Sequence, residues 1–357
     1  HASVYDDAKR KTKRHQHERK DKLPEIFPRT ADKELPCTSC HTPHTKGEGN
    51  DTLYQGHHNA WLRTPNKGGD MCERCHESKT QHARETDAKK RGSNHPLAMK
   101  LAEPPSKGAP GYAQDKNLQA GLADKLKVVG SALGHQQELI CQSCHQIHGG
   151  HGEEALTALD NDKGQLCASC HERQFSKSKD DARHKGVHPV NVKPDKPMKR
   201  HDKEVTFVSC ESCHKVHDGK LGTPLLEKDV EDIDEMCQSC HQRQHAKDKD
   251  DARHKGVHPV NVKMDDEVEI AGTKTREVKC LTCHAVHKGK PDTPALVEDH
   301  KDGQLCAHCH AGKQAIVGSD HDLRVTADKK TNQFKELPRA GVCSACHSLH
   351  RAENQGP

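Results

Sequence analysis

The stretch CQSCHQIH, residues 141–148, contains two cysteines separated by two residues, a histidine directly after the second cysteine, and another histidine three residues further on. The core of this pattern, Cys-x-x-Cys-His, occurs nine times in the 357 residues and uses all eighteen cysteines. Five copies carry the extra histidine and are called doublets; they begin at Cys37, Cys141, Cys210, Cys280 and Cys343. The other four, called plain motifs, begin at Cys72, Cys167, Cys237 and Cys306.

Cys-x-x-Cys-His is the attachment signature of c-type haem. Its two thiols form thioethers with the porphyrin, and the histidine binds the iron from one face. We therefore predict nine covalently bound haem c groups. The predicted thioether residues are Cys37, Cys40, Cys72, Cys75, Cys141, Cys144, Cys167, Cys170, Cys210, Cys213, Cys237, Cys240, Cys280, Cys283, Cys306, Cys309, Cys343 and Cys346. The predicted proximal iron ligands are His41, His76, His145, His171, His214, His241, His284, His310 and His347.

Three other uses of paired cysteines fit less well. Disulfides do not require a histidine after every second cysteine. Structural zinc needs two pairs, or a pair and two histidines, at a recurring separation, whereas the first five motifs are spaced by 35, 69, 26 and 43 residues. A thioredoxin-like redox motif would occur once per domain in a strand–helix setting that this chain lacks.

The composition points to a fold built around cofactors. Only 31% of the residues are apolar, the mean hydropathy is −1.04, and the aromatics are one Trp, three Tyr and four Phe. Such a chain normally remains disordered. Because a porphyrin is a large apolar body, haem can replace the missing core, as metals do in small domains. We predict a multihaem cytochrome c fold of loops and short α-helices around a stacked haem chain, elongated and with almost no β-sheet, which does not form without haem.

The motifs recur in a unit of about seventy residues that carries two haems. The sequence DDARHKGVHPVNVK occupies residues 180–193 and again residues 250–263, and a doublet alternates with a plain motif throughout. The predicted segments are a basic extension (1–36), a first two-haem unit with an inserted loop and helix (37–140), two-haem repeats (141–209, 210–279 and 280–342), and a terminal single-haem motif with its tail (343–357). Such an array buries its faces by stacking neighbouring units.

Distal iron ligands are sought among the 23 histidines outside the motifs. Nine recur at matching places: His44, His148, His217, His287 and His350 close the doublets, His95, His188 and His258 precede prolines, and His321 lies in the last interval. Nine is the number that bis-histidine iron requires at every motif. Other candidates remain open, namely His57, His58, His135, His151, His184, His201, His245, His254, His300 and His308.

The second histidine of a doublet lies three residues after the proximal one. On a helix both side chains would share one face, so they cannot easily bind one iron from opposite sides. The second histidine should therefore bind a neighbouring haem, which brings adjacent porphyrins close together.

Location and partners follow from the same chemistry. The chain starts without Met or an apolar leader, so we expect a product whose secretory signal has been removed. Haem c is attached outside the cytoplasm, and we expect a periplasmic, outer-membrane-associated or extracellular protein. No stretch has the ~18 apolar residues needed to span a bilayer. Nucleic acid is not an expected partner, because the aromatic platforms of single-strand binders are absent.

The alternation of CQSCHQIH, CESCHKVH and CLTCHAVH with plain motifs resembles the doubled-CXXCH multihaem cytochromes. Among these it is most similar to the periplasmic decahaem subunit of porin–cytochrome conduits and its pentahaem relatives, or to a subunit of an extracellular cytochrome filament. The resemblance covers about residues 37–350. It implies low-spin bis-histidine haems in a near-linear chain, with the second histidine of each doublet serving another haem.

The leading functional hypothesis is a non-enzymatic electron-transfer wire for extracellular electron transfer. It would exchange electrons with redox partner proteins, either within an outer-membrane porin conduit or as copies of itself polymerised in a filament. The alternative is a multihaem reductase of a small oxyanion such as nitrite or hydroxylamine. A reductase needs an open axial position, usually with an altered proximal ligand, whereas all nine motifs end in histidine. No catalytic residue is predicted, and haem or metal storage leaves the ordered repeat unexplained.

Overall fold

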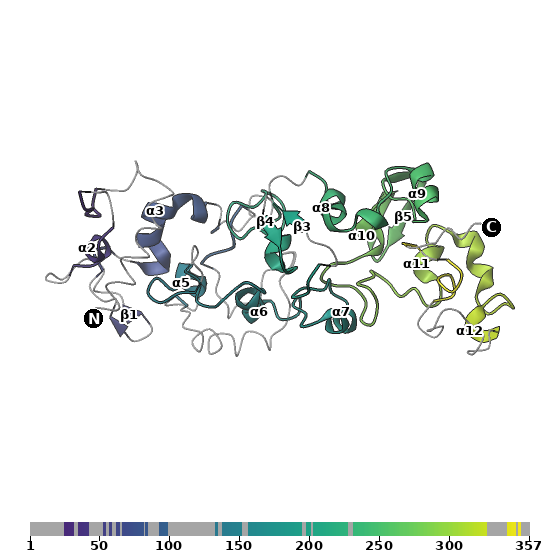
Figure 1. The fold of residues 1–357 in the computed structure, drawn as a ribbon, viewed down its shortest axis with the longest axis horizontal. Coiled ribbons are helices and arrows are strands. Elements are labelled where there is room, and N and C mark those ends of the chain that lie inside the picture. Colours follow the sequence, from purple (N-terminus) through teal and green to yellow (C-terminus); the bar gives the residue numbers. More distant parts are fainter. Residues whose placement is uncertain are drawn as a thin grey trace. The chain divides into compact units, whose positions relative to one another are not determined.

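The computed structural model describes residues 25–31, 35–42, 53–54, 57–58, 62–64, 66–81, 83–84, 93–98, 133–134, 138–151, 156–194, 198–200, 203–227, 231–326, 341–347 and 349–350, and the structural statements below concern this part of the chain. Loops joined by short helices dominate it (Figure 1). The α-helices are α2 (Cys37–Cys40), α3 (Asp70–Thr80), α5 (Cys141–Cys144), α6 (Gln165–Cys170), α7 (Lys179–Lys185), α8 (Ile233–Cys240), α9 (Lys249–Lys255), α10 (Cys280–Cys283), α11 (Gln304–Ala307) and α12 (Leu323–Thr326). The 3₁₀ helices are η3 (Lys67–Gly69), η4 (Cys210–Ser212), η5 (Gln242–Gln244) and η6 (Ala311–Ile316).

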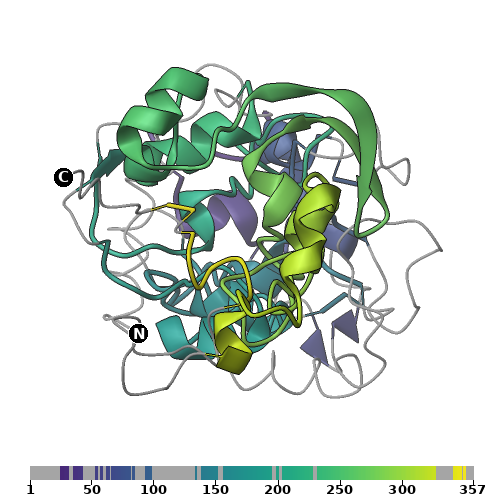
Figure 2. The same cartoon turned by 90° about the vertical axis from the view of Figure 1, so that its right-hand side faces the viewer.

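The described strands form three antiparallel pairs. They are β1 (Leu53–Tyr54) with β2 (His57–His58), β3 (Met198–Arg200) with β4 (Lys203–Val205), and β5 (Val262–Ile270) with β6 (Thr273–Val278). The last pair is a long curved hairpin (Figure 2), in which Val262 lies opposite Val278 and the turn residues Ala271 and Gly272 both have positive φ. The predicted fold of short helices and loops with little sheet is confirmed. The helix predicted in the inserted stretch, from residue 118 to residue 133, lies almost entirely outside the described residues.

Each Cys-x-x-Cys segment folds as a helical turn, which places both sulfurs on one side of the backbone. In eight motifs the N–H of the proximal histidine donates to the carbonyl of the first cysteine, for example His41 to Cys37 at 3.0 Å and His171 to Cys167 at 2.8 Å. The ninth motif, residues 72–76, lies within α3. An α-helical i→i+4 bond therefore sets the spacing that a porphyrin with two thioether links needs.

The repeated fourteen residues form the same helix twice, α7 and α9. Ser178 and Asp248 cap the two N-termini by accepting from the N–H groups of Asp181 and Asp251, at 3.1 Å and 2.7 Å. Acidic residues occupy each first turn and Arg-His-Lys each last turn, which complements the helix dipole. A glycine in the left-handed region ends each helix, and the chain then turns to the His-Pro pair.

Buried apolar side chains are small and scattered in the described residues. Of the eight largest side chains that are fully buried, Ile140 alone is apolar; the others are Asn94, Thr64, Thr293, Asp234, Asp322, Ser39 and Ser176. Apolar clusters are small, such as Ala246 with Ala252 and Val257. Side chains alone therefore supply little hydrophobic stabilisation, as the composition predicts.

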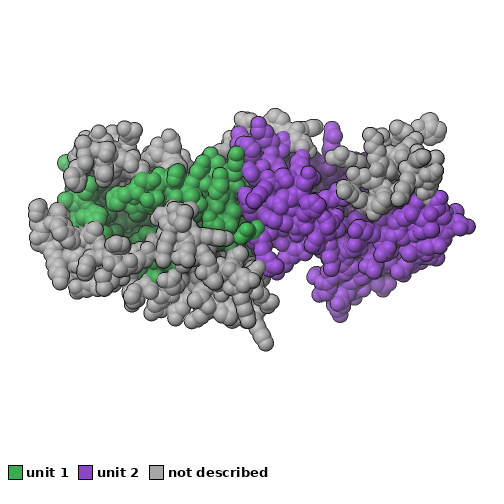
Figure 3. Space-filling view, turned by 90° about the horizontal axis from the view of Figure 1, so that it is seen from below, with its two compact units in different colours: residues 1–172, 209–229 green, residues 173–208, 230–357 purple. Residues whose placement is uncertain are grey.

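The chain divides into two compact units (Figure 3), each made of two segments. Unit 1 comprises His1–Glu172 and Ser209–Asp229, and unit 2 comprises Arg173–Val208 and Val230–Pro357. The doublet at Cys210 belongs to unit 1, where the Val216 carbonyl accepts from the backbone N–H of His95 at 2.8 Å. The predicted repeat boundaries remain predictions. Among the described residues, no helix combines the length and the apolar character needed to cross a bilayer.

Candidate haem sites

Six pairs of imidazole rings face each other within the described residues, and each pair joins a predicted proximal histidine to a predicted distal one. The ring centroids are 6.0–6.3 Å apart in all six. The pairs in unit 1 are His41 with His148, His171 with His95, and His145 with His217. The pairs in unit 2 are His241 with His188, His310 with His258, and His284 with His350.

This spacing fits one iron between two imidazoles. A metal–imidazole bond is about 2 Å long, and with about 1 Å from each ring centroid to its nitrogen, the centroids of two opposed ligands lie about 6 Å apart. Aromatic rings also pack at 4.5–7 Å without a metal. Packing alone would not match every proximal histidine of the six with a predicted distal one, or repeat the separation within 0.3 Å.

The six pairs fall into two classes by the angle between the ring planes. In the doublet pairs, whose proximal histidine belongs to a doublet, the rings are near parallel, at 30° (His41), 17° (His145) and 25° (His284). In the plain pairs the rings are near perpendicular, at 80° (His171) and 81° (His241 and His310). The two motif types therefore differ in ligand geometry as well as in sequence.

Backbone carbonyls orient several of these rings. The Nδ1–H of His214 donates to Pro224 O at 2.8 Å, and that of His284 to Pro294 O at 3.0 Å. The His-Pro histidines use the carbonyl of their own proline, at 3.2 Å for His95 and 3.0 Å for His258. Because a carbonyl only accepts, Nδ1 carries the proton and Nε2 keeps the lone pair that a metal requires.

Burial favours the neutral, metal-binding form of these imidazoles. Loss of hydration disfavours a buried positive charge, and a ligating imidazole must be unprotonated. Burial accordingly lowers the pKa of His171 to about 4. It also lowers the pKa values of His95, His188, His217, His258, His284 and His350 from their usual value.

Cysteines of successive motifs meet in alternation. The first cysteine of a plain motif lies beside the first cysteine of the next doublet, close enough for one thiol to raise the pKa of the other, in the pairs Cys72–Cys141, Cys167–Cys210, Cys237–Cys280 and Cys306–Cys343. The second cysteine of a doublet interacts with the second cysteine of the following plain motif, in the pairs Cys40–Cys75, Cys144–Cys170 and Cys283–Cys309. The attachment points of consecutive porphyrins are thus adjacent, and they alternate between the two thioethers.

The cysteines were also compared with the geometry of disulfides and of metal sites. All eighteen lie within the described residues, and none forms a disulfide. The described part of the chain holds no group of three or more His, Cys, Asp or Glu side chains arranged to bind a metal ion. Pairs of imidazoles suit an iron whose other four ligands come from a porphyrin, so the residues fit haem.

Backbone hydrogen bonds tie distal ligands of different motifs together. The N–H of each His-Pro histidine donates to the residue just before the second histidine of a doublet: His95 to Val216 O (2.8 Å), His188 to Val286 O (2.7 Å) and His258 to Leu349 O (2.8 Å). One contact therefore places a predicted ligand of a plain-motif haem beside a predicted ligand of a doublet haem.

Asn94 reinforces the first of these contacts. Its side chain is 1% exposed. Its Oδ1 accepts from His217 Nδ1 and from the Asp218 N–H, both at 3.2 Å, while its Nδ2 donates to Ser78 O at 3.0 Å and Gln81 O at 2.7 Å. The end of α3 thereby holds His217, the predicted distal ligand of the haem at His145.

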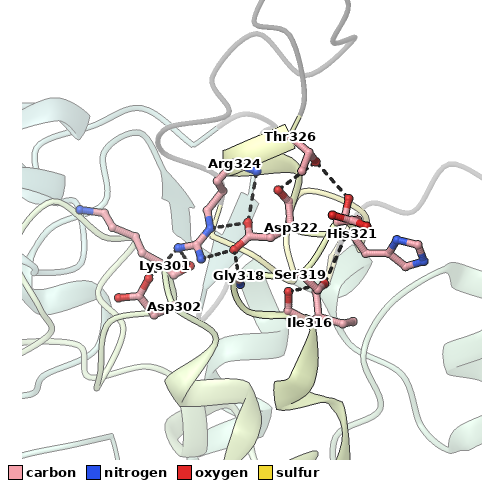
Figure 4. A network of polar contacts seen from close by, with 10 residues as sticks. Lys301, Asp302, Ile316, Gly318, Ser319, His321, Asp322, Arg324 and Thr326 are labelled. Atoms are coloured by element: carbon pink, nitrogen blue, oxygen red, sulfur yellow. Dashed lines mark hydrogen bonds and ion pairs between the residues drawn. The ribbon is translucent and has the colours of Figure 1, made fainter.

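The remaining predicted distal ligands are placed differently. His44 lies outside the described residues. His287 holds in its doublet the place that His148, His217 and His350 hold in theirs, and its role stays a prediction. His321 is exposed, and its ring points away from the adjoining contact between Asp322 and Arg324 (Figure 4).

A dense polar network fixes the loop that carries His321 (Figure 4). Asp322 is fully buried; its Oδ2 accepts from Gly318 N at 3.0 Å and from Arg324 Nη2 at 2.7 Å. Arg324 Nη1 also donates to Lys301 O at 2.7 Å and to Asp302 Oδ1 at 2.6 Å. The network joins residues 318–326 to the turn at residues 301–302.

Several alternative histidines have other contacts. His184 is exposed and pairs with Asp292 at 2.6 Å, and His308 pairs with Glu298 at 2.8 Å. His254 Nδ1 bonds to Asp250 O at 2.7 Å, within its own helix. His245 lies 3.4 Å from Asn261, His300 lies 3.8 Å from Asp299, and His151 forms a backbone bridge with Thr157. His135 and His201 lie outside the described residues, and of His57 and His58 only the backbone in β2 is described.

Sequence reasoning missed the hydroxyls inside the doublets. Ser143, Ser212 and Thr282 each accept from the N–H of the residue just before the first cysteine, at 2.9–3.0 Å. This bond closes the turn that presents the sulfurs. The signal was available, because Ser or Thr directly precedes the second cysteine in four of the five doublets.

A family model described as "Doubled CXXCH motif" matches residues 134–175 and 203–246. No curated protein and no solved structure matches the chain. The matched segments contain two doublets and the two plain motifs that follow them, and the same alternation continues at residues 280 and 306. The matches therefore coincide with the motifs whose rings and sulfurs are paired above.

Proposed function

Because the chain is a multihaem c-type cytochrome, we propose that it works as an electron-transfer wire, passing single electrons between successive haems. Each step reduces one iron from Fe(III) to Fe(II) and oxidises its neighbour. The observation that carries the proposal is the alternating contact between cysteines of consecutive motifs. Porphyrins attached to neighbouring sulfurs would lie close together, as electron exchange requires, and their order would follow the order of the motifs.

We further propose that all nine motifs carry haem c. The first test counts the cofactors. The intact mass of the purified protein should exceed that of the chain by nine haems, and a pyridine haemochrome assay should give the same stoichiometry. Fewer than nine haems per chain would contradict the count and would show that at least one motif carries no haem.

Bis-histidine ligation is tested by removing one distal ligand. In His217→Ala, the haem at His145 loses its sixth ligand, so one low-spin centre should become high-spin in the electron paramagnetic resonance (EPR) spectrum. His184→Ala is the matched control, because His184 is an exposed alternative bonded to Asp292. Equal spectra for the two variants would overturn the assignment.

A reductase of nitrite or hydroxylamine remains the alternative. It needs an iron with an open axial position, where substrate binds. The six proximal histidines described above each face a second imidazole, which supports electron transfer without catalysis. A high-spin signal in the native protein would favour the reductase; low-spin signals from every haem would favour the wire.

The proposed function also implies a location in the cell. We place the protein outside the cytoplasm, exchanging electrons with redox partner proteins, either inside an outer-membrane porin or polymerised with its own copies. Electron microscopy separates these deployments. Filaments with one subunit repeat would establish polymerisation, whereas single particles that co-purify with a porin would establish the conduit.

A further inference from the structure

Three of the four contacts between a plain motif and the next doublet are packed against a glycine. Gly69, Gly164 and Gly303 each lie three residues before their plain motif and have φ of 73–95°, in the left-handed region. A β-carbon on them would lie 2.7, 3.0 and 3.3 Å from the Sγ of Cys141, Cys210 and Cys343, respectively. At these contacts there is little room for a side chain.

The contact between Cys237 and Cys280 has an aspartate at the same place. Asp234 lies three residues before Cys237, inside α8, because the helix begins early, with Asp232 as its cap. The side chain is 1% exposed. Its Oδ1 accepts from the Cys280 N–H at 3.1 Å, and its Oδ2 is buried without a hydrogen-bond partner among the described residues.

The nearby cation does not neutralise this carboxylate. Lys279 lies 2.5 Å from Asp232 and 3.8 Å from Glu277, so its ammonium group pairs with these two carboxylates. A charge buried beside low-dielectric material is weakly screened by water and salt. The contact with Cys237 raises the pKa of the Cys280 thiol, burial adds to the rise, and the charge of Asp234 acts in the same direction. The field of Asp234 therefore reaches the sulfur.

We propose that Asp234 lowers the reduction potentials of the two haems attached at Cys237 and Cys280, through the charge of a fully buried carboxylate at the place where the other three contacts have a glycine. The inference rests on the proposed function, since it requires haem at both motifs. Reduction adds one electron to a ferric centre and lowers its positive charge. A fixed negative charge stabilises the ferric form, and local charge and burial are established controls of haem potential.

The test is a spectroelectrochemical titration of the full-length holoprotein carrying Asp234→Asn. The amide oxygen still accepts from the Cys280 N–H, so the substitution removes charge and keeps the bond. Two of the haems should titrate at higher potential, while the remaining absorbance change stays in place. Glu211→Gln is the matched control: Glu211 follows Cys210 at the preceding contact but is exposed, so its effect should be small and should vanish at high salt.

The results distinguish the effect of Asp234 on the haem potentials from the premise that both motifs carry haem. Superimposable titrations of native protein and Asp234→Asn, at equal haem content and with unchanged low-spin spectra, would overturn the role of Asp234 and leave the wire intact. Absence of haem at these motifs in the native protein would overturn the proposed function itself. If Asp234→Asn fails to incorporate haem, Asp234→Ser keeps a hydroxyl oxygen for the same bond. New high-spin signals in both variants would assign Asp234 a structural role and overturn the inference.

Discussion

A histidine that binds iron needs a second contact to hold its ring, and Asn94 supplies one for His217. Four of the hydrogen bonds of its side chain join the end of α3 to the doublet at Cys210. In the later repeats the residue before the His-Pro pair is Val187 or Val257. Asn94 is thus specific to the first unit, where the spacing between motifs is longest.

We predict that Asn94→Ala destabilises unit 1 by about 1–3 kcal/mol, because it leaves buried polar groups without partners. It should also free the His217 ring and produce a fractional high-spin signal from one haem. Asn94→Asp is the informative comparison, since it keeps the acceptor for His217 but loses both donors. Thermal unfolding and the EPR spectrum measure the two effects; a low-spin signal intact in both variants would contradict the positioning role.

The buried carboxylate of Asp322 holds the loop that carries His321. Arg324 holds the pKa of the Asp322 carboxyl well below its usual range. A carboxyl with a depressed folded pKa stabilises the fold above its unfolded pKa of about 3.9, and the contribution is lost as the pH falls through the folded value. Asp322→Asn should therefore accelerate hydrogen exchange at Gly318 at neutral pH. Asp302→Asn, at an exposed carboxylate of the same network, should do so less; equal protection in all three proteins would refute the network's role.

At the residue scale, the sequence predicts candidate ligands but not the residues that hold them in place. The motif identifies His145, and the doublet spacing identifies His217 as a ligand for another haem. Nothing in the sequence indicates that Asn94, 123 residues away, accepts from His217 Nδ1. A partner so distant depends on how the chain folds back, and its own sequence surroundings carry no haem signature.

At the scale of elements, the two motif types hold their ligands at different angles. The plain pairs take their distal ligand from a His-Pro turn, and the doublet pairs take it from the next doublet. For bis-imidazole ferric haem, parallel ring planes give a rhombic low-spin EPR spectrum, whereas perpendicular planes give one broad low-field signal. We predict that both signals coexist in the native protein, since axial ligation tunes the iron.

Two single-residue variants can assign each EPR signal to the plain pairs or to the doublet pairs. His258→Ala should remove intensity from the broad low-field signal, and His350→Ala should remove intensity from the rhombic one, each with a gain of high-spin signal. Each variant is the control for the other, because both ligands lie in unit 2 and their segments are joined by the bond from His258 N to Leu349 O. A single class of signal, or losses in the opposite order, would contradict the assignment by motif type.

Gly186 ends α7 and touches the loop after the doublet at Cys280. Its φ is +68°, and a β-carbon would lie 2.2 Å from Gly289 O. A left-handed conformation costs an alanine about 1–2 kcal/mol, and the clash adds to this. Gly186→Ala should therefore destabilise more than Gly222→Ala, where φ is +76° and nothing lies within 4 Å. It should also disturb His188, two residues on; equal melting temperatures for the two variants would show that the close approach is unimportant.

The repeated sequence accounts for helices α7 and α9 but not for the β5–β6 hairpin that follows the second copy. Identical residues at 180–193 and 250–263 give the same capped helix, because capping and charge are local. The sequences that follow differ, and the second continues into the β5–β6 hairpin. In β5 the apolar residues Val262, Met264, Val268 and Ile270 lie on one face and charged residues on the other, so the alternation typical of a half-buried strand was present and was missed.

At the scale of the molecule, the order of the haems follows the order of the motifs within each unit. Second cysteines connect a doublet to its plain motif, and first cysteines connect that plain motif to the next doublet. Haems arranged in this alternating order would form a single unbranched path for electrons. Loss of one haem should therefore interrupt electron transfer along the chain. The periodic spacing predicted the neighbours, but the alternation between the two thioethers required the structure, since it depends on which sulfurs face each other.

We predict that the chain does not fold without haem. The largest buried side chains are mostly polar, and the apolar clusters are small, so little hydrophobic stabilisation remains to oppose the conformational entropy of folding. A variant with all eighteen cysteines changed to serine should show far-UV circular dichroism of an unfolded chain and almost no amide protection. Cys343→Ser with Cys346→Ser, which removes one haem, is the control and should lose protection locally. Native-like protection in the haem-free chain would show that side chains alone form the core.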